Sequence, residues 1–109
     1  MKYLCPASEI TEHSAKEFVL SEDLRIFVVK EDRQFYGYIN DCPHNSWPLN
    51  FQPNLFLNAE KTHIQCSNHM AFFEKKSGRC VSGPCVGDQL KKVPISLKKG
   101  ELYTDIREK

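Results

Sequence analysis

The sequence lacks a long apolar run and has almost no net charge, and both absences narrow the class of protein. No stretch approaches the roughly 20 apolar residues of a membrane-spanning helix. The first residues, Met1–Pro6, also lack the apolar run of about 7 to 15 residues that a signal peptide needs. A net charge of +1 gives no support for nucleic-acid binding, which requires a clustered basic face. We therefore expect a cytoplasmic protein that binds neither membranes nor nucleic acids.

The chain is also short, and no repeat or linker divides it. Its 109 residues are enough for one domain with one modest core. Hydrophobic residues make up 40% and charged residues 27%, which is ordinary for a globular domain. We therefore predict a single domain over residues 1–109, so that any function has to fit one module.

Short segments rich in β-branched and aromatic residues, separated by turn residues, predict an all-β domain. Leu24–Val29 and Gln34–Ile39 flank a polar turn and predict a hairpin, as do the residues around Lys98–Gly100. Glu9–Glu17 has some helical character, but it is short enough to be a loop or a single turn. The expected strands are Glu17–Leu20, Leu24–Lys30, Gln34–Asn40, Asn54–Leu57, Thr62–Cys66, Ala71–Glu74, Leu90–Leu97 and Glu101–Ile106.

The middle of the chain differs in composition from both flanks. It contains four of the five cysteines, together with prolines 43, 48, 53 and 84 and glycines 78, 83 and 87. Such a segment cannot form long strands and is expected to be rich in loops that the flanking strands position. We predict that residues 41–89, approximately, form the functional subdomain.

Two short motifs in this segment pair a cysteine with a histidine. Cys42 and His44 form a C-x-H motif, Cys66 and His69 form a C-x-x-H motif, and 21 residues separate the two. An odd number of cysteines, with two of them close to histidines, favours metal binding over disulfides. One zinc ion could take two sulfur and two nitrogen ligands, as in a structural module that binds other proteins. A single residue between Cys42 and His44 is awkward for one ion, however, and a pair of neighbouring metals removes that strain.

The motifs and their neighbours resemble the Rieske ferredoxins and related Rieske domains, and most of all the soluble ferredoxins of aromatic-ring dioxygenase systems. The resemblance covers roughly residues 17–107. Its elements are the first box Cys42–Leu49, the second box Cys66–Glu74 with Ser77-Gly78 after it, the proline-bearing segment Ser82–Cys85 and the closing strands from Val93 to Ile106.

This resemblance implies a fold of stacked antiparallel sheets with an inserted cluster-binding subdomain, and one 2Fe-2S cluster as cofactor. One iron would take Cys42 and Cys66, and the other would take His44 and His69. It also implies an electron carrier without a substrate site, whose redox partners (a flavin reductase, an oxygenase or another oxidoreductase) dock at the edge formed by His44 and His69. The alternative is a small subunit or accessory redox domain of a larger enzyme, similar to the small subunit of assimilatory nitrite reductase.

The sequence departs from the family pattern in three places. The interval between the boxes is lengthened around Phe51–Asn54, so that this loop is expected to form a distinctive surface. Met70 replaces a glycine that often follows the second histidine. Trp47 and Ser67 stand where the Rieske proteins of respiratory cytochrome bc complexes have disulfide-forming cysteines, which places the chain nearer the ferredoxins.

Two positions that follow His69 in the sequence affect the expected reduction potential. High-potential family members place hydroxyl groups two and four residues after that histidine, where this chain has Ala71 and Phe73. Neither side chain can donate a hydrogen bond to the cluster. We therefore predict a potential in the lower half of the range of about −150 to +300 mV that Rieske centres span.

The remaining cysteines, histidines and lysine pairs have simpler interpretations. We expect Cys5 to be an incidental exposed thiol near a frayed end, and Cys80 and Cys85 to be reduced structural cysteines. His13 and His63 lack a cysteine or histidine at suitable spacing, and His63 fits a surface position. The pairs Lys91-Lys92 and Lys98-Lys99 are expected to be solvated.

Overall fold

The computed structural model describes residues 2–22, 24–40, 56–58, 61–66, 71–83 and 86–105, in which strands are the main regular structure. Among these residues, no helix has the length and apolar character needed to cross a membrane. The elements are β1 (Lys2–Pro6), the 3-10 turn η1 (Ala7–Glu9), β2 (Ser14–Ser21), β3 (Leu24–Glu31), β4 (Gln34–Ile39), β5 (Ile64–Cys66), β6 (Ala71–Phe73), β7 (Cys80–Ser82), β8 (Lys92–Val93), β9 (Ile95–Lys98) and β10 (Glu101–Thr104).

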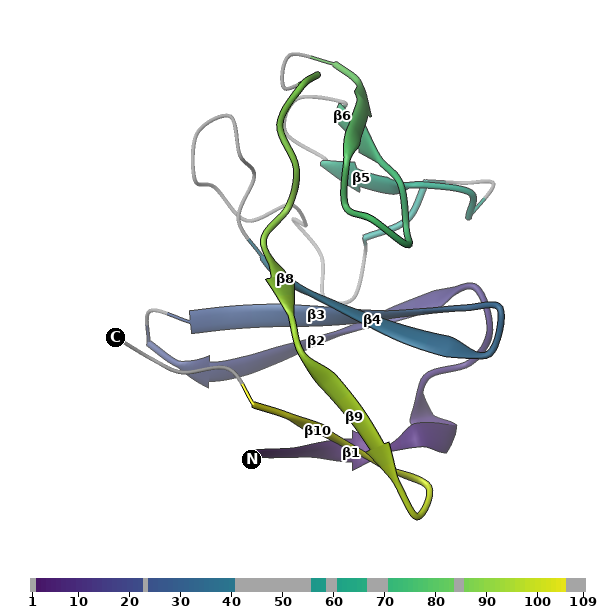
Figure 1. Ribbon diagram of the computed structural model, residues 1–109, viewed down its shortest axis with the longest axis vertical. Helices are drawn as coiled ribbons and strands as arrows, with labels where there is room; N and C mark the ends of the chain where they lie inside the picture. The colour runs from purple at the N-terminus through teal and green to yellow at the C-terminus, as the bar shows by residue number, and fades with distance from the viewer. Residues whose placement is uncertain are drawn as a thin grey trace.

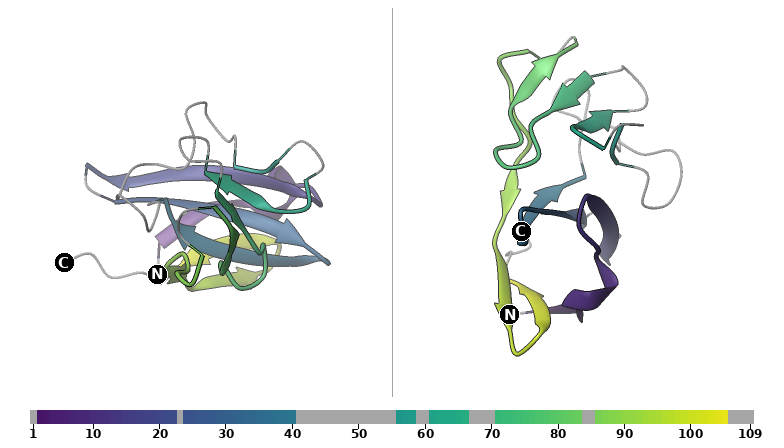
Figure 2. Two further views of the ribbon diagram at one scale, coloured as in Figure 1. Left: turned by 90° about the horizontal axis from the view of Figure 1, so that it is seen from above. Right: turned by 90° about the vertical axis from the view of Figure 1, so that its right-hand side faces the viewer.

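The strands form three antiparallel sheets arranged in tiers (Figure 1). The terminal sheet has the strand order β1-β10-β9, the central sheet has β2-β3-β4-β8, and the small sheet has β5-β6-β7. In Figure 1 the small sheet lies above the central sheet and the terminal sheet lies below it, and the right-hand view of Figure 2 shows the same order. The stacked antiparallel sheets confirm the predicted all-β fold.

Strand β3 is covered on both faces, and its sequence explains why. Its residues Ile26, Phe27, Val28 and Val29 are all fully buried. Phe27 and Val29 pack in the core cluster shared with the small sheet, whereas Val28 packs in the cluster shared with the terminal sheet. A strand buried on both faces needs a continuous apolar run instead of an alternating one. The small sheet is therefore attached to the rest of the protein through a shared core.

Two predicted hairpins are confirmed, and both use tight turns with positive φ angles. Asp32 and Arg33 join β3 to β4 with φ angles of 53° and 64°, and Lys99 and Gly100 join β9 to β10 with φ angles of 52° and 77°. Such two-residue turns match the twist of the flanking strands. The first turn lacks glycine, and the Glu12 carboxylate supports it by accepting hydrogen bonds from the backbone N–H groups of both turn residues.

Several predicted strands have different boundaries in the structure. β2 begins at Ser14, so the second half of Glu9–Glu17 is extended. The residues before it form the 3-10 turn Ala7–Glu9 and a second turn at Glu12 and His13. The expected strand Leu90–Leu97 is divided at Pro94 into β8 and β9. Of Asn54–Leu57, the structure describes Phe56 and Leu57, and Leu57 bridges to Ile64. β1 and β7 are additional strands that the sequence pattern did not indicate.

The prediction for Cys5 is wrong. Cys5 lies in β1 opposite Leu102 of β10 and is only 4% exposed. It packs with Ile10, Val28 and Leu102 in the core between the terminal and central sheets. Burial raises the pKa of its thiol above the ordinary value. Because the N-terminal strand pairs with a strand almost a hundred residues later, no local pattern indicated that this end of the chain is ordered.

Candidate metal centre

Of the four predicted ligands, the structure describes Cys66, whereas Cys42, His44 and His69 lie outside the described residues. Cys66 is the last residue of β5 and is fully buried. Its partner across the sheet is Ala71, the first residue of β6. The cysteine of the second box is therefore fixed by strand pairing at the end of β5. A ligand held by a strand is positioned more rigidly than one on an unsupported loop.

Asn40, two residues before the first box, is fixed to the central sheet. Asn40 precedes Cys42 by two residues and is only 4% exposed. Its backbone N–H donates to the carbonyl oxygen of Arg25 at 2.8 Å, and its Nδ2 donates to Glu17 Oε2 at 2.8 Å. The neighbouring N–H of Ile39 donates to the carbonyl oxygen of Lys91 at 2.9 Å. The last described residues before the first box are thus held by hydrogen bonds to the central sheet and to Lys91.

The surroundings of Cys66 are apolar. It belongs to a core cluster that also contains Ile64, Ala71, Phe73 and Cys80, all of which are at most 1% exposed. Apolar side chains lower the local dielectric constant and keep water from a metal centre. Ala71 and Phe73, which the sequence placed two and four residues after His69, are both fully buried and offer no hydroxyl group.

A close backbone contact supports the second box from the opposite side. Gly83 has a φ of +102°, and a Cβ atom at this position would lie 2.7 Å from Ala71 Cα and 3.0 Å from Ala71 Cβ. Only glycine allows both this φ and this approach. The backbone of Gly83 therefore lies close against Ala71, which the sequence places two residues after His69.

The described part of the site fits an iron–sulfur cluster. A buried thiol at the end of a strand, in apolar surroundings and beside a glycine that allows close backbone approach, suits a sulfur ligand of a protected cluster. The donor set of two cysteines and two histidines in the sequence suits either a Rieske centre or zinc by chemistry alone.

The other cysteines and histidines that the structure describes have structural contacts. The Cys80 thiol is buried and donates to the carbonyl oxygen of Ser82 at 3.4 Å, while Cys85 lies outside the described residues. His63 is half-buried in the turn before β5, and its Nδ1 lies 3.0 Å from Thr62 Oγ1. His13 is exposed, and its Nδ1 lies 3.2 Å from Glu31 Oε2.

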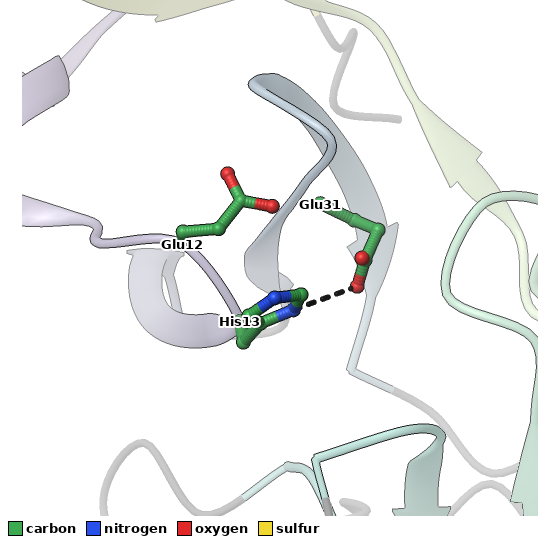
Figure 3. A group of neighbouring side chains, drawn as sticks. All are labelled: Glu12, His13 and Glu31. Atoms are coloured by element: carbon green, nitrogen blue, oxygen red, sulfur yellow. Dashed lines mark hydrogen bonds and ion pairs between the residues drawn. The ribbon is translucent and has the colours of Figure 1, made fainter.

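A second group of possible metal ligands lies at the tip of the β3–β4 hairpin. Ligand atoms of Glu12, His13 and Glu31 all lie within 4.8 Å of one another, and Figure 3 shows the His13 ring facing Glu31. The ammonium group of Lys75 already forms an ion pair with Glu31 Oε2. Both carboxylate oxygens of Glu12 accept backbone hydrogen bonds. This group is therefore an ion-pair network that joins the central sheet to the turn between β6 and β7.

This network predicts that part of the protein's stability depends on pH. The hydrogen bond from Lys75, with a smaller contribution from His13, holds the pKa of Glu31 below its ordinary value of 4.5. A carboxyl group whose pKa is lowered in the folded state stabilises the protein at pH values above its ordinary pKa. This stabilisation is lost as the pH falls through the folded-state pKa. We expect the difference in unfolding free energy between the native protein and Glu31→Gln to be largest at neutral pH and to shrink below pH 4.5. Rapid-mixing denaturant unfolding of both proteins across this range measures it, and a constant difference would contradict the assignment.

Comparison with known proteins identifies the family that the chain matches. The profile of the Rieske [2Fe-2S] domain family matches residues 1–96. The chain is 24% identical over 106 residues to the 3-phenylpropionate/cinnamic acid dioxygenase ferredoxin subunit of Photorhabdus laumondii, which covers 97% of this chain and 94% of that protein.

Two solved structures show the same fold. The ferredoxin of carbazole 1,9a-dioxygenase from Nocardioides aromaticivorans IC177 has a TM-score of 0.74 and 18% identity, covering 98% of this chain and 97% of that one. The terminal oxygenase of carbazole 1,9a-dioxygenase from Novosphingobium sp. KA1 has a TM-score of 0.79 and 18% identity, covering 99% of this chain but 30% of that one. The fold is therefore found both in a small ferredoxin and in part of a larger oxygenase.

Proposed function

Because the chain belongs to the Rieske [2Fe-2S] domain family, we propose that it passes single electrons between a reductase and a terminal oxygenase. The cofactor is one Rieske-type 2Fe-2S cluster. The main support for the carrier role is the likeness to a dioxygenase ferredoxin subunit over 94% of that subunit's length. Such relatives are electron carriers, and the chain is accordingly expected to have no substrate site of its own. A cytoplasmic location is part of the same proposal.

The proposed ligands are Cys42 and Cys66 for one iron and His44 and His69 for the other. Cys66 supports the assignment because it is buried at the end of β5, opposite Ala71. The anchoring of Asn40 supports it as well, because the first box begins two residues further on. Histidine ligation leaves the oxidised centre with less negative charge than four thiolates would, which makes it easier to reduce. The edge formed by His44 and His69 is the proposed docking site for redox partners.

The reduction potential is expected to lie in the lower half of the range of about −150 to +300 mV. Hydrogen bonds to the cluster sulfurs raise the potential, and the buried side chains of Ala71 and Phe73 cannot donate them. A redox titration with the optical spectrum recorded measures the midpoint directly. A midpoint above about +200 mV would contradict the role assigned to these two residues.

A second candidate function is an accessory redox domain of a larger enzyme. It is favoured by the likeness to a terminal oxygenase, in which the matching part makes up 30% of the chain. The two functions differ in assembly. An accessory domain purifies with its enzyme at a fixed ratio, whereas a mobile carrier purifies alone and exchanges electrons with its partners by collision.

The carrier function is tested by anaerobic reductive titration of the purified protein. We expect reversible uptake of about one electron per chain, with bleaching of a red-brown colour. Reoxidation by a protein acceptor should then restore the spectrum. A colourless protein that takes up no electrons would refute the proposal and favour a structural zinc module.

A further inference from the structure

The two proposed ligand boxes are attached to different parts of the protein. The first box follows Asn40, whose backbone and side chain are bonded to the central sheet. Cys66 of the second box belongs to the small sheet. The relative position of the two ligand pairs therefore depends on how firmly the small sheet is held against the central sheet. The inference that follows rests on the proposed ligand set.

A buried lysine connects the small sheet to the central sheet. Lys75 lies in the turn between β6 and β7, and its side chain is only 8% exposed. Its ammonium group pairs with Glu31 at the end of β3 and donates to the carbonyl oxygen of Lys61 at 2.6 Å. Lys61 lies in the turn before β5. One side chain thus joins the tip of the β3–β4 hairpin to the turns that flank both β5 and β6.

The backbone of Lys75 is held by the same hairpin. The buried Tyr38 hydroxyl of β4 donates to the carbonyl oxygen of Lys75 at 2.6 Å. Burial raises the pKa of this hydroxyl far above its ordinary value, so that it stays a donor. The neighbouring Lys76 pairs with Asp32, but both of these side chains are more than half exposed.

Beside these contacts the junction is open to solvent. A groove of about 620 Å³ lies along it, lined by His13, Lys61, His63 and Ser77 among others, and Lys75 and Glu31 form part of its wall. At this groove, polar bonds centred on Lys75 add to the shared apolar core in holding the small sheet against the central sheet. A charge whose partner is removed in such partly buried surroundings is strongly unfavourable.

We propose that Lys75 is a positioning residue that fixes the small sheet, and with it the second ligand pair, relative to the first ligand pair. Its contacts lie at the ends of β5 and β6 opposite to Cys66 and Ala71, so it acts on the cluster only through the strands. Loss of Lys75 should allow the small sheet to move while the central and terminal sheets stay folded.

The test compares Lys75→Met, which keeps the length of the side chain, with Lys76→Met, which breaks the adjacent exposed ion pair. Glu31→Gln is a milder variant because Lys75 keeps its bond to Lys61. Each holoprotein is first analysed for iron and acid-labile sulfide. Hydrogen exchange followed by mass spectrometry then compares two amide groups at the small sheet, Gln65 bonded to Phe56 and Glu74 bonded to Arg79, with a control amide. The control is Asn40, whose amide is bonded to Arg25 at the end of β3 far from Glu31.

We expect exchange at Gln65 and Glu74 to accelerate about tenfold or more in Lys75→Met, and less in Glu31→Gln, while exchange at Asn40 stays unchanged. The electron paramagnetic resonance lines of the reduced cluster should broaden in the same two variants, because the ligand pairs then sample a range of relative positions. Lys76→Met should match the native protein in both measurements.

Uniform acceleration across all sheets would overturn the proposal, because it would indicate only a general loss of stability. Unchanged line widths in a protein whose small sheet exchanges faster would overturn it as well, as would a native exchange pattern in Lys75→Met. Absence of iron and sulfide from the native protein would instead refute the proposed function, and the exchange measurement would still decide whether Lys75 holds the small sheet.

Discussion

Replacement of Cys66 by serine is expected to remove nearly all iron and acid-labile sulfide from the purified protein. Iron–sulfur clusters depend on thiolate ligands, and a serine oxygen is a much poorer ligand for them. Cys66 is fully buried at the end of β5, and its pairing with Ala71 fixes its position. Colorimetric iron and sulfide analysis of anaerobically purified protein measures the effect.

Cys5→Ser is the matched control for this experiment. Cys5 is also a buried strand cysteine, at 4% exposure, but it lies in the terminal sheet opposite Leu102. A hydroxyl in this apolar core should lower stability by about 1 to 3 kcal/mol and leave iron and sulfide at native amounts. Retention of iron by Cys66→Ser, or equal loss from both variants, would contradict the assignment of Cys66 as a ligand.

Substitution of Gly83 by alanine is expected to be much more damaging than the same substitution at Gly87. Both glycines have nearly the same φ, +102° and +104°, and both are exposed. The strain of an L-residue in this conformation, about 1 to 3 kcal/mol, should therefore be common to both variants. Only at Gly83 does the added Cβ meet the backbone of Ala71, at 2.7 Å, whereas nothing lies within 4 Å at Gly87.

The additional cost of crowding at Gly83 is about 1 to 3 kcal/mol. Since 1 kcal/mol corresponds to about 4 to 8 °C for a domain of this size, Gly83→Ala should melt at least several degrees below Gly87→Ala. Thermal unfolding of the two holoproteins, followed by circular dichroism, measures the difference. Equal melting temperatures would show that the segment after β7 is not pressed against the second box.

The sequence predicted the hairpins and the all-β fold because those features depend on local patterns. The run Ile26–Val29 indicated a strand, and its burial on both faces is what a continuous apolar run requires. The pairing of β1 with β10 depends on residues far apart in the chain, and this is why Cys5 was wrongly placed on the surface. β7 lies between Gly78 and Gly83, and Val81 is its only β-branched residue, so its composition indicated a loop.

The candidate ligands were predictable from the sequence, because the chemistry of the side chains identifies them. Cysteine and histidine at short spacing identify possible ligands without any knowledge of the fold, and the structure places Cys66 at a strand end that suits this role. The roles of Cys42, His44 and His69 stay predictions, because these residues lie outside the described parts of the chain. No sequence pattern indicated the role of Lys75, because a lysine in a polar turn is ordinarily solvated. Its contact with Glu31 arises only from the packing of two sheets.

The ligand set is tested most directly by pulsed electron paramagnetic resonance on the reduced protein. With histidine nitrogens labelled with ¹⁵N, we expect hyperfine coupling to two nitrogen nuclei, because His44 and His69 would bind the iron that is reduced. Coupling to one nitrogen only should remain in His44→Cys. A spectrum without strong nitrogen coupling in the native protein would show a cluster held by sulfur alone and would contradict the proposed ligands.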